Sequence, residues 1–271
     1  MKYIIISVCV FSFVSCAKNK ITNEKDYTAF LTPKYFNEAA QKNQQEIAFW
    51  THRLQKDTGS YVNKLELGYN YISLFKLTGH IENLKTGDSL LKSASAKLNN
   101  SDPGILQALA QVSITQHQFS NAAAYNQSAY RKNGSAYIHS LLSFDAGMEL
   151  GWFSVANKSL VQLNDQSSFD FLIRKAKFQD HSGVLQGAIK TMEKAFKKIK
   201  NTNKVHLYCW TLSNLGDMYG HAGRIKESYN AYLKILRRDP AYLYALKGIA
   251  WIAYSHDGDL KEAERILKFI K

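Results

Sequence analysis

Apolar residues recur with helical spacing along most of the chain, in segments separated by polar turns. In residues 37–55, for example, Ala40, Ile47, Trp50 and Leu54 fall on or near one face of a helix. Strand-like alternation is scarce, so the pattern predicts an all-α protein without a sheet. We expect an N-terminal helix within 36–58 that pairs with the helix beginning near Tyr61 and covers the end of a helical stack.

A self-similar unit of about 34 residues recurs in the C-terminal half. Leu215 and Ile249 are 34 residues apart, whereas Gly223 and Gly258 are 35 apart because one residue is added in the turn. A turn glycine followed five residues later by a small residue marks each unit; the pairs are Gly151 with Ala156, Gly183 with Ala188, Gly223 with Ser228 and Gly258 with Ala263. Such periodicity indicates helical hairpins that are stable only when stacked.

These residues resemble the tetratricopeptide repeat (TPR), best in the unit from about Val205 to Pro240. The resemblance covers roughly residues 60–271 and implies a right-handed superhelical solenoid of antiparallel helix pairs, about five to six units within 59–271. The sequence departs from the family at Asn126, where an aromatic residue is usual, and at His117, where the turn glycine is usual. The alternative is an irregular helical bundle.

The N-terminus has the pattern of an export signal. Lys2 precedes an apolar run from Ile4 to Val14, which is too short to span a bilayer. The run ends in Phe13-Val14-Ser15-Cys16, which resembles a bacterial lipoprotein signal with phenylalanine in place of the usual leucine. We therefore expect a signal peptide over 1–16, lipidation of Cys16 and a flexible tether over 17–35. The alternative is an ordinary cleaved signal with an incidental cysteine.

The net charge of +13 directs attention to possible anionic partners. Much of the excess lies in a lysine-rich segment over 190–204, which we interpret as a solvated helix face and connector. Attraction to anionic lipid or to an acidic envelope partner is the alternative, and we expect no nucleic-acid partner for an exported protein. Cys209 is the only cysteine beyond the signal, so the mature chain has no internal disulfide.

A search for catalytic and metal-binding motifs finds none. The eight histidines are scattered, and Cys-x-x-Cys, Gly-x-Ser-x-Gly and phosphate-binding glycine loops are absent from the sequence. Asp257-Gly258-Asp259 lacks the further oxygen ligands of a calcium loop and is interpreted as a turn. The sequence therefore predicts a non-enzymatic protein without a cofactor or metal.

The resemblance implies that the first helix of each unit lines a concave groove. Mapped onto the last two units, its outward positions are Trp210, Ser213, Asp217, His221, Tyr244, Lys247, Trp251 and Tyr254. Aromatic residues in this arrangement favour binding of an extended peptide or a sugar, although several of them could instead pack between hairpins. The basic clamp of the family for a terminal carboxylate is not reproduced, because Ser213 and Asp217 replace its lysine and asparagine.

Two functional classes follow from these patterns. The first is a lipid-anchored adaptor that holds envelope proteins together, of which an outer-membrane-assembly lipoprotein is one form. An enzyme subunit or a regulatory partner of an enzyme is a further alternative. The second is a lipoprotein that captures glycan or peptide for an outer-membrane importer. We expect the periplasmic face of the outer membrane, with surface display as the alternative. The apolar helix before Lys271 predicts an open end of the stack, covered by further repeats, by a partner or by a second copy.

Overall fold

The structure, a computed structural model, describes residues 19–163 and 165–270, without the side chains of residues 34–39. This part of the chain forms thirteen α-helices and two short 3-10 turns, and it contains no strand. The helices are α1 (Pro33–Lys56), α2 (Tyr61–Thr78), α3 (Ile81–Lys97), α4 (Pro103–Thr115), α5 (Phe119–Arg131), α6 (Ala136–Glu149), α7 (Phe153–Val161), α8 (Phe169–His181), α9 (Leu185–Ile199), α10 (Val205–His221), α11 (Ile225–Arg238), α12 (Leu243–Ser255) and α13 (Leu260–Ile270).

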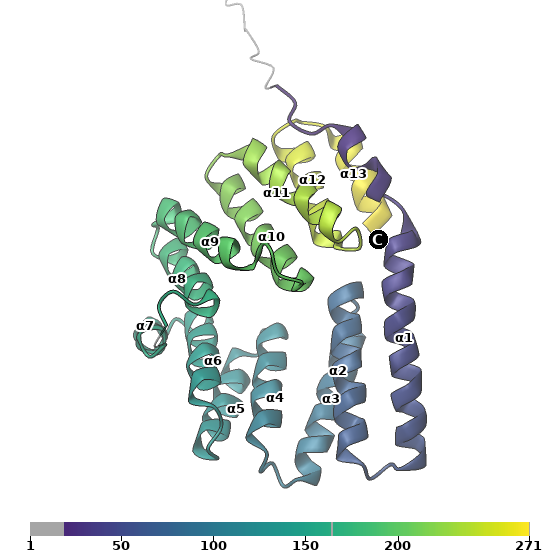
Figure 1. The fold of residues 1–271 in the computed structure, drawn as a ribbon, viewed down its shortest axis with the longest axis vertical. Helices are drawn as coiled ribbons and strands as arrows, with labels where there is room; N and C mark the ends of the chain where they lie inside the picture. Colours follow the sequence, from purple (N-terminus) through teal and green to yellow (C-terminus); the bar gives the residue numbers. More distant parts are fainter. Residues whose placement is uncertain (1–18, 164, 271) are drawn as a thin grey trace, which may run out of the picture.

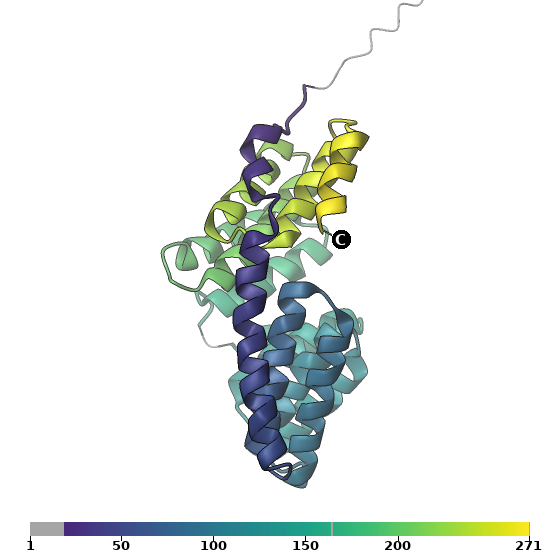
Figure 2. The ribbon, with the colours of Figure 1, turned by 90° about the vertical axis from the view of Figure 1, so that its right-hand side faces the viewer.

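Helices α2 to α13 form six consecutive antiparallel pairs that follow one another around an arc (Figure 1). The long helix α1 packs against α2, as the sequence predicts, and extends from the first pair toward α13 (Figures 1 and 2). The two ends of the arc come close enough for the end of α2 and the start of α12 to line one cavity of about 570 Å³. The chain is thus a TPR-like solenoid that nearly closes on itself.

Turn glycines end the first helix of most pairs. Gly151, Gly183, Gly223 and Gly258 all have φ between 69° and 78°, a left-handed conformation that glycine adopts without a steric penalty. His117 stands at the equivalent position of its pair with φ 58°. The turn interpretation of the sequence is therefore confirmed, including the place of His117.

The small residues five positions after these turns lie where paired helices cross. Ala156, Ala188, Ser228 and Ala263 are all buried, as is Ala122 in the pair that has His117. A larger side chain at such a crossing would force the two helices apart. Their burial confirms the repeat register.

The two Asp-Pro pairs of the chain have different local structures. Asp102 caps α4 through its Oδ1, which accepts a hydrogen bond of 2.9 Å from the Ile105 amide, and Pro103 is the first helical residue. Asp239 instead accepts from the Ala241 amide at 3.1 Å, within a turn around Pro240. Helix α12 therefore begins only at Leu243, because the Asp239 carboxylate is used in the turn and does not cap a helix at Pro240.

Residues 20–31, which we call the N-terminal strap, pack on the last helical pair. The Asp257 carboxylate accepts hydrogen bonds from the amides of Ile21 and Thr22 at 2.9 and 2.8 Å, and Lys20 forms a 2.7 Å ion pair with Asp259. The sequence predicted a flexible tether over 17–35. That prediction was wrong for the strap, because Lys20, Ile21 and Thr22 bond to the turn between α12 and α13, although several other polar residues of the strap remain exposed.

The side chains of the strap also cover the apolar end of the stack. Tyr27 is completely buried, and its hydroxyl donates a 2.7 Å hydrogen bond to Glu262 of α13. Ile21, Phe30 and Leu31 join the same core as Ile266 and Phe269. The expected open end is therefore covered in part by a distant segment of the chain itself, while Leu267 of α13 stays 44% exposed. The repeat pattern could not reveal this contact.

Candidate functional site

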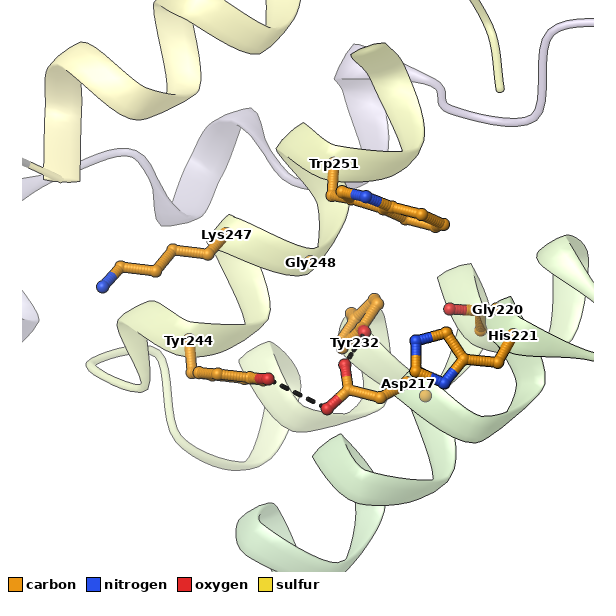
Figure 3. A pocket seen from close by; sticks show the side chains of 10 residues that line it. Asp217, Gly220, His221, Tyr232, Tyr244, Lys247, Gly248 and Trp251 are labelled. Carbon is orange, nitrogen blue, oxygen red and sulfur yellow. Dashed lines mark hydrogen bonds between the residues drawn. The ribbon is translucent and has the colours of Figure 1, made fainter. Parts of the chain in front are cut away.

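Three helices of the last two pairs enclose a pocket of about 330 Å³, which we call the aromatic pocket (Figure 3). It lies between α10 and α12, with α11 supplying its floor. Its side chains are Asp217, His221, Ser228, Tyr232, Tyr244, Lys247 and Trp251, and its glycines are Gly216, Gly220 and Gly248.

Two glycines create the space for the floor of the pocket. A Cβ atom added to Gly216 or Gly248 would lie 2.8 or 2.3 Å from the ring of Tyr232. The Tyr232 ring of α11 therefore reaches between α10 and α12 only because both facing positions lack a side chain. The local sequence thus fixes how closely the two helices approach.

Asp217 is held in place by two tyrosine hydroxyls (Figure 3). Tyr232 donates to its Oδ1 at 2.5 Å and Tyr244 to its Oδ2 at 2.9 Å. Burial, with the neighbouring carboxylate, raises the pKa of Tyr244 to about 12, and the same two causes raise the pKa of Tyr232. Both phenols therefore stay neutral near pH 7, and the pocket holds one fixed carboxylate between them.

The opposite wall presents an accessible aromatic ring. Trp251 is 48% exposed, and its ring edge would lie 3.4 Å from a Cβ at Gly220. The His221 ring lies near it, whereas the Lys247 side chain extends away from Asp217 (Figure 3). A large exposed ring beside a fixed carboxylate suits recognition of a side chain or ring of a ligand.

The structure brings together five of the residues that the sequence placed in the groove: Asp217, His221, Tyr244, Lys247 and Trp251. Trp210 lines a separate groove on the other side of α10. Ser213 was wrongly placed outward: it is buried, and its hydroxyl donates to the Trp210 carbonyl at 2.8 Å. Tyr254 is 61% exposed and does not line the pocket.

Sequence reasoning missed Tyr232 as a site residue, because it is on the second helix of its unit. Its position midway in sequence between Gly216 and Gly248 was the available signal. Glycines at equal distances before and after a tyrosine indicate that its ring packs against both neighbouring helices, at positions where a Cβ atom would clash with it.

The described residues offer neither a metal-ligand cluster nor an accessible thiol. Among residues 19–163 and 165–270, no group of three His, Cys, Asp or Glu side chains could hold a metal ion. Cys209 is completely buried, and this burial raises the pKa of its thiol to about 12, so the reactive thiolate is scarce.

The expected lipidation residue, Cys16, lies outside the residues that the structure describes, as does the whole expected signal peptide. No helix in the described part of the chain combines the length and apolar character needed to cross a bilayer.

Comparison with known proteins identifies the fold. No protein-family model and no curated protein matches the chain. Among solved structures, the APC/C hetero-tetramer Cut9–Hcn1 matches with a TM-score of 0.62 at 16% identity, over 89% of this chain and 44% of that chain. Yeast Tom70 matches with a TM-score of 0.57 at 12% identity, over 97% of this chain and 62% of that chain.

A third structure, a thermophilic TPR protein of Thermus thermophilus, has a TM-score of 0.55 at 16% identity, over 78% of this chain and 99% of that chain. At these identities the likeness shows the fold alone, which is a solenoid of TPR-like helix pairs. The chain spans less than two thirds of the Tom70 chain and of the chain matched in Cut9–Hcn1.

Proposed function

We propose that this protein is a non-enzymatic scaffold that binds a partner polypeptide through the aromatic pocket and is anchored to the bacterial envelope by lipidation of Cys16. The observation that carries the binding role is the convergence of Asp217, Tyr244 and Trp251 in one pocket. Large aromatic surfaces beside a fixed polar group are typical of binding hot spots. The Cut9–Hcn1 structure, which has a similar fold, is itself an assembly of two different proteins.

The pocket supports binding better than catalysis. Asp217 accepts hydrogen bonds through both of its oxygens, so it is oriented but not poised to take a proton from a substrate. Peptide recognition needs only a preformed surface with few groups to immobilise. The exposed face of Trp251 would also accept a sugar ring, so capture of glycan for an importer is the second candidate.

The test of the binding role is a crosslinking pull-down of the full chain from its native membrane. We expect a discrete protein partner with the wild-type chain and its loss in the variant Trp251→Ala/Tyr244→Ala. Phe49→Ala is the matched control, because Phe49 is 52% exposed but lies on α1, far from the pocket in sequence. Equal recovery of the partner by the pocket variant and the control would contradict the proposal, and recovery of glycan alone would favour the second candidate.

The lipid anchor is proposed from the sequence around Cys16, and the docked strap limits how far the folded body can lie from it. With Lys20 docked on Asp259, only four residue steps separate Cys16 from the folded body, a span of at most about 14 Å. The body would therefore lie close to the bilayer, at the periplasmic face of the outer membrane or, in the alternative, at the cell surface. Several buried CH₂ groups, at about 0.8 kcal/mol each, would supply the affinity.

Fractionation of the variant Cys16→Ala tests the anchor separately. We expect the wild-type protein in the detergent phase and the variant as an unlipidated precursor or in the soluble fraction. Retention of the mature variant in the detergent phase would contradict lipid anchoring without affecting the binding role.

A further inference from the structure

A larger groove lies on the other side of α10, between α4, α6, α8 and α10, with a contribution from α9. We call it the central groove; its volume is about 610 Å³, within the range of ligand sites. Its floor is apolar and combines aromatic rings with methionines: Phe169, Ile173, Met192, Leu207, Trp210 and Met218. Methionine and aromatic side chains adapt to a large apolar side chain of a ligand.

The cations of the central groove are already engaged by the protein. Arg174 donates to Asp145 at 2.6 Å, to the Asp170 carbonyl at 3.2 Å and to the Leu141 carbonyl at 3.4 Å, which ties α8 to α6. Lys177 forms a 2.6 Å ion pair with Glu149. Each of the two cations is therefore already paired with a carboxylate of the protein.

Carboxylates are in excess along the same wall. Asp145, Asp170 and Asp180 face the groove with only Arg174 and Lys177 as cations in its lining. Asp180 is exposed and has no ion-pair partner among the described residues. Burial raises the pKa of Asp145 despite the adjacent Arg174, so a further cation would help to keep this carboxylate ionised. The groove thus has the opposite sign to the chain, whose net charge is +13.

We propose that the central groove binds an extended peptide in which a large apolar side chain is flanked by lysine or arginine. This inference rests on the proposed scaffold function and specifies a second contact with the partner. The apolar side chain packs on Trp210 and Phe169, and a flanking cation approaches Asp180. Asp170 already accepts a 2.5 Å hydrogen bond from the Tyr137 hydroxyl and lies 3.9 Å from Arg174, so it adds to the negative charge of the wall without being the main contact. The side-chain amides of Gln111 and Asn214 line the same groove and can pair with a peptide backbone.

Selection from a displayed library of random twelve-residue peptides tests this inference on the purified full chain. We expect enriched sequences that place Trp, Phe or Leu within a few residues of Lys or Arg. A fluorescently labelled synthetic peptide of the enriched sequence then measures affinity, with an otherwise identical peptide carrying glutamate in place of each lysine or arginine as the control. The basic peptide should bind and lose affinity as salt rises, and the acidic one should not bind.

Variants of the two pockets separate this inference from the proposed function. Trp210→Ala should weaken binding of the basic peptide by about 30-fold, as for a hot-spot residue. Asp180→Asn, an exposed change that leaves the fold intact, should weaken it by about 2- to 5-fold. Trp251→Ala should leave it unchanged.

Enrichment of acidic or uncharged peptides, or binding insensitive to both Trp210→Ala and Asp180→Asn, would overturn the inference. Binding that depends on Trp251 alone would overturn it while supporting the aromatic pocket. Failure to select any peptide would count against both.

Discussion

The first two helical pairs, α2–α5, and the last two, α10–α13, share the same antiparallel arrangement but differ in the size of their buried apolar clusters. In α2–α5 a small buried cluster is formed by Leu91, Ile105 and Leu109, and other buried apolar residues such as Leu84 and Leu106 lie outside it. The cluster that includes α10–α13 runs without interruption from α6 to the end of α13 and takes in Tyr27 of the strap. Both ends of the array thus have a covering segment, α1 on the first pairs and the strap on the last, but the continuous apolar cluster is much larger at the last pairs.

The turns between helices also differ between the two halves of the chain in which residues adopt the left-handed conformation. All described non-glycine residues with positive φ lie in the first half of the chain: Asn99, Asn100, His117 and Asn133. The later turns use Gly151, Gly183, Gly223 and Gly258. A left-handed conformation costs most non-glycine residues about 1–2 kcal/mol but is tolerated by asparagine, so His117 is the main site of backbone strain in the first half, which also has the smaller apolar cluster. We infer that stability is concentrated at the end that holds the aromatic pocket and the strap.

Removing the buried aromatic residue of the strap should have the largest effect. Tyr27→Ala should lower the free energy of unfolding by about 3–5 kcal/mol, because it deletes a completely buried ring and leaves Glu262 without its hydroxyl partner. Chemical denaturation measures the loss, and Phe49→Ala, at a half-exposed position on α1, serves as the control. Equal stability of the two variants would mean that the strap does not cap the stack.

The second largest loss of stability is expected from changing Asp257, whose carboxylate binds the backbone of the strap. Asp257→Asn should cost about 1.5–3 kcal/mol, since hydrogen bonds to a charged acceptor from Ile21 and Thr22 are replaced by weaker ones. The matched change Asp165→Asn removes a carboxylate that bonds only to the adjacent Ser167 and should cost less. The amides of Ile21 and Thr22 should lose hydrogen-exchange protection only in the first variant.

The same contacts predict how the strap depends on pH. Hydrogen bonding by Lys20 lowers the pKa of Asp259, and hydrogen bonding by Arg265 lowers that of Glu262. Burial opposes ionisation of Asp257, but hydrogen bonds from His256 and the strap outweigh it and lower its pKa. Lowered carboxyl pKa values stabilise the docked strap at neutral pH, and this stabilisation is lost as pH falls below about 4. Exchange protection of the strap that is unchanged down to pH 3 would contradict this.

The close approach under the aromatic pocket should give a smaller but distinct effect. Gly248→Ala should cost about 1–3 kcal/mol, because the new Cβ would lie 2.3 Å from the Tyr232 ring and must push α11 and α12 apart. Ser255→Ala, on the exposed surface of α12, is the control and should change the melting temperature little. A Gly248→Ala variant that melts with the control would remove the geometric basis of the pocket.

Exchanging residues in the turns should give the smallest effects, of opposite sign in the two halves. Gly223→Ala should lower the free energy of unfolding by about 1 kcal/mol. A Cβ added at this position would meet no other atom within 4 Å, so only the left-handed backbone opposes the change. His117→Gly should stabilise the first half by less than about 1 kcal/mol, because it removes strain but adds freedom to the unfolded chain. A loss of stability in His117→Gly would show that the His117 side chain contributes more than its backbone strain costs.

The sequence predicted what is local and periodic. The turn glycines, the buried small residues at helix crossings and the pairing of α1 with α2 all follow from spacing and pattern. The docking of the strap was not predictable in this way, because Thr22 and Asp257 are 235 residues apart and belong to no repeat. The composition of residues 20–31 is that of a solvated linker, yet Lys20 and Thr22 bond to Asp259 and Asp257 in the turn between α12 and α13.

The candidate site was predictable to the extent that it follows the register of α10 and α12. Asp217 and Trp251 were found because outward positions recur along the first helix of each unit. The prediction for Ser213 was wrong because this residue faces the core instead of the groove, and its hydroxyl donates a hydrogen bond to the Trp210 carbonyl. The central groove needs four helices from different units, and the sequence reached only its Trp210.

The central claim is that a partner protein contacts the inner side of the last two pairs. Site-specific photocrosslinking tests it most directly, with a photoreactive residue placed at Lys247 or His221 in the aromatic pocket, or at Lys234, an exposed residue of α11 that does not line that pocket. In cells, the account predicts one discrete protein adduct from positions 247 and 221 and none from position 234. Adducts from position 234 alone, or from all three positions alike, would contradict it.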